Sequence, residues 1–124
     1  MLEIKTEAVA SDVLSQSVIE GMLEKKASDI VLMDLREVKN AIADFFVICS
    51  GNSDTQVDSI ADSIEEKVFK KSEQNPWKKE GIENKEWVLI DYVDVVAHVF
   101  SKEKRTFYAL EELWGDAKVT VIEE

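Results

Sequence analysis

The chain has 124 residues, 45% of them hydrophobic, and its 26 Asp and Glu outnumber 15 Lys and Arg to give a formal net charge of -11. This length supports one domain with a hydrophobic core and is too short for two. The acidity argues against direct binding of DNA or RNA, which needs cations to neutralise phosphates, and favours a basic protein partner.

A single cysteine and the start of the chain indicate a cytoplasmic setting. Cys49 lies in an apolar run, so a disulfide or a multi-cysteine zinc site within one chain is excluded. The first residues lack the pattern of a signal peptide, and no segment approaches the roughly 20 apolar residues that span a bilayer. We expect a domain over 11–115, an N-terminal extension over 1–10 and a C-terminal tail over 116–124.

The first half of the chain predicts one helix and two strands. Residues 11–27 carry apolar side chains at helical spacing behind the candidate caps Ser11 and Asp12. The runs 29–35 and 45–50 are short, apolar and rich in β-branched or aromatic residues, which is typical of strands. The segment between these two runs is mixed and predicts a connection.

A second helix and an edge strand are expected next. Ser53 followed by Gln56 matches a capping box, and apolar residues then recur at helical spacing to about Lys71. Residues 77–81 follow a proline and contain two lysines, which predicts a short strand at a sheet edge.

Residues 87–100 predict a hairpin of two buried strands that is polar on one face only. A two-residue turn at Tyr92 and Val93 would set the register. The pairs on the polar face would then be Asp91 with Asp94, Leu89 with Val96, and Trp87 with His98. The opposite face would be plain core, made of Val88, Ile90, Val95, Ala97 and Val99.

The end of the chain predicts a third helix over 102–114, stopped by Gly115, and either a loose tail or an added strand over 119–122. The residues of this helix expected to face the core are Phe107, Leu110, Leu113 and Trp114. The expected fold class is therefore α/β (α+β), with a mixed sheet of about five strands and three helices packed on it.

Two opposed carboxylates would repel unless a metal ion, water or a basic partner meets them. One interpretation is a metal-dependent nucleotidyltransferase-like enzyme using Asp91 and Asp94. That chemistry also needs a Gly-Ser turn followed by two acids on the next strand. Here Gly51 precedes Asn52, and the acids that follow belong to the predicted second helix, so the catalytic pattern fails.

The other polar candidates favour structural roles or a protein-binding surface. A lone histidine such as His98 is more often packed or hydrogen-bonded than catalytic. Trp87 beside it and the nearby acids are typical of a protein-recognition patch, where aromatic residues anchor and charges steer. We interpret Cys49 as a core thiol and Ser53 as a helix cap.

A series of motifs resembles the ribosomal silencing factor family, also called the Iojap or RsfS family. The matching segments are 29–35, 43–51, 59–62, Pro76 with 80–81, 87–91, 94–100 and 108–114. They cover about residues 12–114 in unbroken order. No one motif is decisive, but the series is highly specific.

The resemblance implies a nucleotidyltransferase-like architecture that lacks the active site. It implies a translational repressor, not an enzyme, with no cofactor and no metal. This repressor would bind ribosomal protein L-fourteen on the large ribosomal subunit and block joining of the small subunit, with at most a minor contact to rRNA. An exposed apolar face also allows the free protein to form a homodimer.

Partner-binding residues follow from the same resemblance. Trp87, Asp91, Asp94 and His98 fall on family motif positions, and the predicted patch is extended to Glu80, Tyr92 and Tyr108. Family members often carry glycine where this chain has Val93. A β-branched residue disfavours the positive φ of a tight turn, so a wider hairpin tip is expected.

Overall fold

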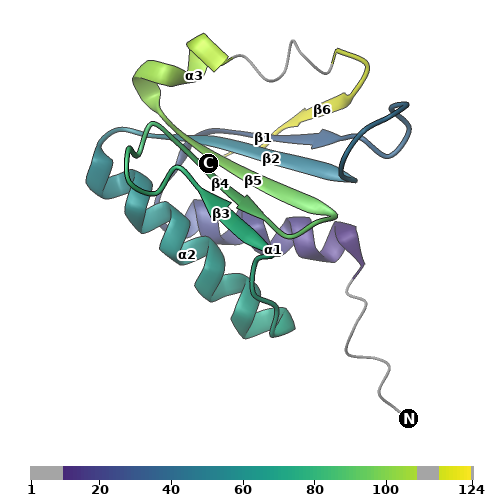
Figure 1. Ribbon diagram of the computed structural model, residues 1–124, viewed down its shortest axis with the longest axis horizontal. Coiled ribbons are helices and arrows are strands. Elements are labelled where there is room, and N and C mark those ends of the chain that lie inside the picture. The colour runs from purple at the N-terminus through teal and green to yellow at the C-terminus, as the bar shows by residue number, and fades with distance from the viewer. Residues whose placement is uncertain (1–9, 109–114, 124) are drawn as a thin grey trace.

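A mixed six-stranded sheet with the order β3-β4-β5-β2-β1-β6 is the central layer of this computed structural model, which describes residues 10–108 and 115–123 (Figure 1). The side chains of residues 106–108 are also outside the description. The elements are α1 (Ser11–Glu24), β1 (Ser28–Asp34), β2 (Phe45–Gly51), α2 (Asp54–Ser72), β3 (Lys78–Glu80), β4 (Trp87–Asp91), β5 (Val95–Ser101), α3 (Lys102–Tyr108) and β6 (Lys118–Val121).

The predicted fold class is confirmed, with one strand more than expected. Residues 119–122 take the added-strand alternative, because β6 pairs antiparallel with β1 at one edge of the sheet. The short strand β3 forms the other edge, as predicted. β2 and β5 are parallel neighbours in the centre. Of the expected core residues of the third helix, Phe107 lies in α3 with its side chain outside the description, and Leu110, Leu113 and Trp114 lie outside the described part of the chain.

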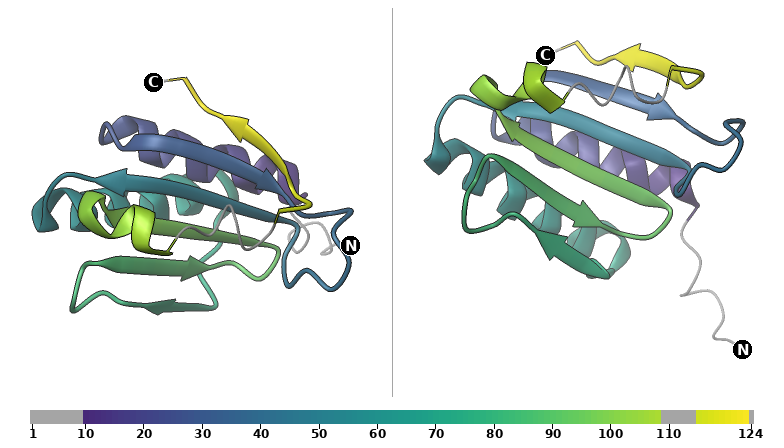
Figure 2. Two further views of the ribbon diagram at one scale, coloured as in Figure 1. Left: turned by 90° about the horizontal axis from the view of Figure 1, so that it is seen from above. Right: turned by 45° about the horizontal axis from the view of Figure 1, so that its top comes forward.

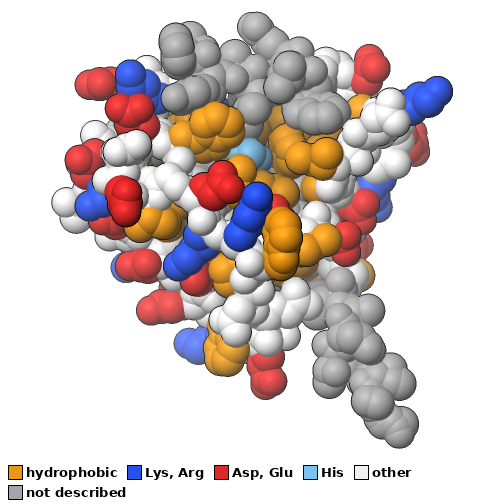
Figure 3. All heavy atoms as spheres, viewed as in Figure 1, with side chains coloured by type: hydrophobic (Ala, Val, Ile, Leu, Met, Phe, Trp, Pro, Cys, Tyr) orange, Lys and Arg blue, Asp and Glu red, His pale blue; other side chains and the backbone are white. Residues whose placement is uncertain are grey.

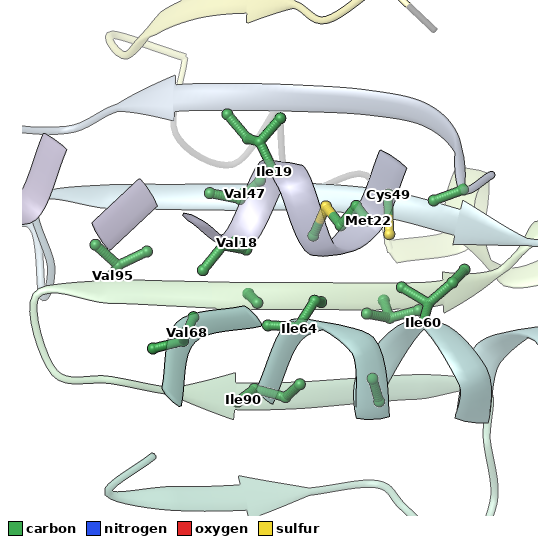
Figure 4. Close-up of a cluster of buried hydrophobic side chains, with 14 of the residues drawn as sticks. Val18, Ile19, Met22, Val47, Cys49, Ile60, Ile64, Val68, Ile90 and Val95 are labelled. Atoms are coloured by element: carbon green, nitrogen blue, oxygen red, sulfur yellow. The ribbon is translucent and has the colours of Figure 1, made fainter. Parts of the chain in front are cut away.

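Helices α1 and α2 cover one face of the sheet, whereas α3 lies on the other (Figure 2). Alternate residues of β2, β4 and β5 point toward α1 and α2 and meet their apolar stripes (Figure 4). Buried residues of this layer include Val18, Met22, Val47, Cys49, Ile60, Ile64, Ile90 and Val99. Because side chains alternate along each strand, the other half of them points to the second sheet face, where they form a separate apolar cluster.

One helix cap was predicted correctly and the other was not. Ser53 is the N-cap of α2, and its hydroxyl accepts the amide of Gln56 at 3.1 Å. The predicted caps of α1 are wrong, because that helix begins one residue earlier. Its N-cap is Ala10, which offers no side-chain cap, and the Ala10 carbonyl accepts the amide of Leu14 at 3.0 Å.

The hairpin register differs from the predicted one by two residues. Asp91 lies opposite Val96 and not opposite Asp94, so the predicted pairing of two carboxylates is wrong. The other two predicted pairs are wrong by the same shift, because Leu89 lies opposite His98 and Trp87 opposite Phe100. A shift of two residues keeps each side chain on its predicted face of the sheet.

The turn centres one residue further along than predicted, at Val93 and Asp94. The tip is wider than a two-residue turn after Asp91, because β4 ends at Asp91, β5 begins at Val95 and the last paired residues are Asp91 and Val96. The amide of Tyr92 donates to the carbonyl of Val95 at 2.9 Å, and the amide of Asp94 donates to the carbonyl of Tyr92 at 3.0 Å. Val93 itself takes the positive φ, at 77°. Asp91 supports this conformation, because its Oδ1 accepts the Val93 amide at 2.7 Å.

Candidate functional site

The sheet face opposite α1 and α2 carries most of the predicted partner-binding residues. The register of β3, β4 and β5 places eight side chains on it: Lys78, Glu80, Trp87, Leu89, Asp91, Val96, His98 and Phe100. We call these eight residues the aromatic face. Figure 3 views the molecule from this side and shows hydrophobic side chains gathered around the pale-blue edge of the histidine.

Four rings form a packed layer at the centre of this side of the sheet. Phe46 meets His98 edge to face at a centroid distance of 4.6 Å, and Trp87 stacks on its cross-strand neighbour Phe100 at 5.1 Å. The indole Nε1 of Trp87 donates a hydrogen bond to Nδ1 of His98 at 3.0 Å. Trp87 is half-buried, whereas the other three rings are buried.

His98 is a neutral, buried histidine. Its side chain is 3% exposed, and this burial lowers its pKa to about 3. Because Nδ1 accepts the indole hydrogen bond, the ring proton belongs on Nε2, and Nε2 has no hydrogen-bond partner among the described residues. The structure therefore places His98 beneath the surface of the aromatic face, hydrogen-bonded to Trp87.

An open apolar groove of about 340 Å³ lies beside this ring layer. Its lining residues are Ile42, Trp77, Asp91, Val93 and Val96. The side chains of Ile42, Trp77 and Val93 are 74%, 68% and 57% exposed, and the Lys78 ammonium lies 5.1 Å from the centroid of the Trp77 ring. Large exposed apolar side chains that gather in this way mark interaction sites.

Of the five groove residues, only Asp91 was among the predicted partner contacts. Trp77 was predicted only as the start of an edge strand, and Ile42 lies in the mixed connection between β1 and β2. The Trp77 amide donates to the Asp91 carbonyl at 2.7 Å, which brings the end of the α2–β3 connection to the hairpin tip. A signal for Trp77 was present, because a tryptophan directly before an edge strand has one face that no neighbouring strand can cover.

The two aspartates have separate positions. Asp91 is half-buried in the groove, opposite Lys78 of β3. Asp94 is exposed at the hairpin tip, and its carbonyl accepts the amides of Asp44 and Phe45 at 2.8 and 3.1 Å. The nucleotidyltransferase interpretation thus loses the cross-strand carboxylate pair on which it was based. In the part of the chain that the structure describes, no three His, Cys, Asp or Glu side chains gather as metal ligands.

The remaining predicted contacts fall in three places. Glu80 lies on the aromatic face, opposite Leu89. Tyr92 is turned toward the helix side, where it is 6% exposed and its hydroxyl has no hydrogen-bond partner among the described residues. Burial, with a smaller contribution from Glu65, raises the pKa of Tyr92. The side chain of Tyr108 lies outside the described residues.

The structural roles assigned to the other candidates agree with the structure. Cys49 is fully buried under the helices, and this burial raises the pKa of its thiol. Ser53 is occupied as the cap of α2. No described helix is both long enough and apolar enough to cross a membrane.

Fold and site together define an α+β domain whose sheet is covered by α1 and α2 on one face and carries aromatic and acidic side chains on the other. Residues 8–124 match the family described as "Ribosomal silencing factor during starvation", RsfS. The chain belongs to the ribosomal silencing factor family, as its motifs predicted. That family name points to a regulatory factor of the ribosome and not to an enzyme.

Individual relatives agree with this assignment. The chain is 43% identical over 110 residues to a ribosomal silencing factor of Halalkalibacterium halodurans, covering 89% of this chain and 92% of the relative. It is 46% identical over 94 residues to that of Bacillus subtilis, covering 76% and 78%. A crystal structure of a Chromobacterium violaceum protein superposes with a TM-score of 0.80 at 30% identity, covering 94% of this chain and 95% of that one.

Proposed function

We propose that this protein represses translation in the cytoplasm by binding ribosomal protein L-fourteen on the large subunit and thereby blocking association with the small subunit. The observation that carries the proposal is the apolar groove with an acid in its wall, on the face that α1 and α2 leave uncovered. A domain of this length has a radius of gyration of about 14 Å, so its bulk alone obstructs a subunit contact. No step of this function needs a cofactor.

The groove has the composition of a binding hot spot. Trp77 is a large, rigid side chain that projects beside Ile42 and Val93, and such anchors contribute most of the binding energy at protein interfaces. Trp87 and Leu89 continue the apolar surface along β4, where both are half-buried. A partner with an apolar protrusion would bury this surface.

Charge supports a basic partner for the same groove. Asp91 lies in its wall and Asp94 at the adjoining tip, within a chain whose net charge is -11. Such a field attracts a basic protein and repels phosphate, which limits rRNA to a minor contact. Opposite charges at the rim of an interface mainly accelerate association and fix orientation.

Co-sedimentation with isolated large subunits tests the proposal. Trp77→Ala should weaken binding by roughly 30-fold or more, the effect of losing a hot-spot side chain. Asp91→Asn keeps the Oδ1 acceptor that supports the turn but removes the charge, and should weaken binding less. The matched control is Phe69→Ala, which removes an aromatic ring of similar exposure from α2 on the other side of the molecule.

Two outcomes would count against the proposal. Failure of the wild-type protein to sediment with large subunits would remove its basis. Equal affinities of the wild type, Trp77→Ala and Trp87→Ala would move the docking surface away from the aromatic face and the groove. Subunit joining followed by light scattering then tests the block itself, because a bound but non-blocking protein would leave the rate and extent of joining unchanged.

A further inference from the structure

We infer that His98 is a positioning residue, which holds the Trp87 indole in the orientation that a partner meets on the aromatic face and does not touch that partner itself. The inference rests on the proposed docking function, and it reassigns a residue that the family motif would make a direct contact. Its basis is the indole hydrogen bond to Nδ1 combined with the burial of the imidazole.

The imidazole is held rigidly enough to act as a reference point. His98 lies on β5, between β2 and β4, with Ile48 opposite it on one side and Leu89 on the other. Its ring is packed edge to face against Phe46 and lies nearly parallel to Phe100, at an interplanar angle of 10°. Because paired strands on both sides fix the position of the Nδ1 acceptor, the hydrogen bond restrains the indole and not the imidazole.

The hydrogen bond to His98 adds a directional restraint to the packing of Trp87. It lies on β4 with one side of its ring on Phe100 and is half-buried. A torsion between sp³ and sp² atoms has broad wells, so a directional contact helps to fix the angle of the indole about it. The hydrogen bond from Nε1 selects the orientation in which the polar edge points inward and the benzenoid edge is offered to a partner.

A purely structural role does not account for a histidine at this position. Its described neighbours include Phe46, Phe100, Trp87 and Leu89, so an apolar ring would pack beside them without any polar atom to bury. The histidine instead carries Nε2 unpaired among the described residues, which costs stability. What the histidine adds, and an apolar ring cannot, is the acceptor at Nδ1.

The hydrogen bond can be tested without the ribosome, by NMR of the three indole N–H groups that the sequence provides. The Trp87 signal is assigned with Trp77→Phe and Trp114→Phe. It should exchange slowly with solvent in the wild type, exchange at least about tenfold faster in His98→Phe, and remain slow in His98→Asn, whose Oδ1 reproduces the Nδ1 acceptor. Fast exchange in the wild type would overturn the inference.

The docking role is tested by a double-mutant cycle in large-subunit binding. His98→Phe should lower affinity by about tenfold and His98→Asn by much less. In a Trp87→Phe background, which lacks the N–H, His98→Phe should have no further effect. An equal loss in both backgrounds, or wild-type affinity for folded His98→Phe, would show that His98 only packs.

The failure of this inference is separable from failure of the proposed function. If the wild type does not bind large subunits, the docking role falls with the proposed function, while the exchange data still decide whether His98 orients the indole. If the wild type binds and Trp87→Ala binds equally well, only the inference is overturned. If His98→Phe does not fold, two other observations decide. Slow solvent exchange of the Trp87 indole N–H in the wild type, together with a loss of large-subunit affinity in Trp87→Phe, supports the inference. The absence of either observation rejects it.

Discussion

Val93 shows how a single residue sets the geometry of the proposed docking surface. It holds a φ of 77° at the hairpin tip, while its exposed side chain forms part of the groove wall. The Val93 amide donates to Oδ1 of Asp91, and the Asp94 amide donates to the carbonyl of Tyr92. A β-branched residue in this conformation stores backbone strain, and the surrounding hydrogen bonds must compensate for it.

Replacing Val93 with glycine should therefore stabilise the protein by about 1 kcal/mol, because glycine adopts a positive φ without steric cost. Urea unfolding would show this as a higher midpoint with an unchanged slope. Val93→Ala is the matched control, since it removes the branched side chain but keeps the Cβ that causes the strain. Equal gains in both variants would mean that the side chain, and not the φ, is the source of the strain.

His98 predicts a pH dependence of stability. Its pKa is lowered from 6.5 to about 3 by burial, so below the higher value the unfolded chain takes up a proton that the folded chain does not. Stability contributed by this group is present at neutral pH and is lost as the pH falls. From about pH 7.5 to about pH 5 the loss should be about 2 kcal/mol.

His98→Asn is the reference for that measurement, because it keeps a polar side chain that does not titrate. Denaturant unfolding of both proteins over this pH range separates His98 from the carboxylates, which titrate mainly at lower pH. Parallel stability curves for the two proteins would contradict a strongly lowered pKa.

At the scale of elements, the close contact of α1 and α2 supports the whole helix layer. Gly21 of α1 faces the backbone of α2, and a Cβ built on it would lie 2.7 Å from Cα of Ile64. The hydroxyl of Ser63 donates to the Gly21 carbonyl at 2.8 Å across the same contact. Only a residue without a side chain allows the two helices to approach so closely.

Gly21→Ala should destabilise the protein by about 2 kcal/mol, because the clash is with backbone and exceeds the gain of about 1 kcal/mol in helix propensity. Thermal unfolding should show a Tm lower by several degrees. Val13→Ala, at an exposed position of the same helix, should change stability little. If Gly21→Ala were as stable as the wild type, the two helices could move apart without loss.

Elements could be predicted from the sequence because each is encoded locally. Apolar periodicity found α1 and α2, and alternation found both faces of β4 and β5. The hairpin register could not be predicted in the same way. It depends on whether the turn centres before or after Val93, a choice that the side chain of Asp91 decides by hydrogen bonding.

The groove was beyond sequence reasoning for a different reason. Ile42, Trp77 and Val93 come from three separate connections that only the sheet order brings together. The burial of the His98 and Tyr92 side chains likewise depends on how the elements pack together in the fold. Neighbouring strands and helices cover both side chains, although a motif in the sequence gives them the same weight as exposed residues.

At the scale of the whole molecule, the two sheet faces differ in what they carry. The helix side completes the core, and the ion pairs Lys67 with Glu24 and Lys71 with Glu20 join α1 to α2 on its surface. The other side carries the groove, with Asp91 in its wall and Asp94 at the tip. A net charge of -11 acts on any approaching partner, but local charges decide which side it meets.

Salt and charge variants separate these two effects of charge on the proposed binding to a basic ribosomal protein. Raising the salt from about 0.1 M to about 1 M shortens the screening length from about 10 Å to about 3 Å, so the association rate should fall at least tenfold.

Asp94→Lys at the tip and Glu66→Lys on the exposed side of α2 change the net charge equally. Stopped-flow kinetics should show a much slower association for Asp94→Lys than for Glu66→Lys, with dissociation changed less than by Trp77→Ala. Equal rates for the two charge variants would mean that net charge alone steers the encounter, and a rate indifferent to salt would mean that charge does not steer it at all.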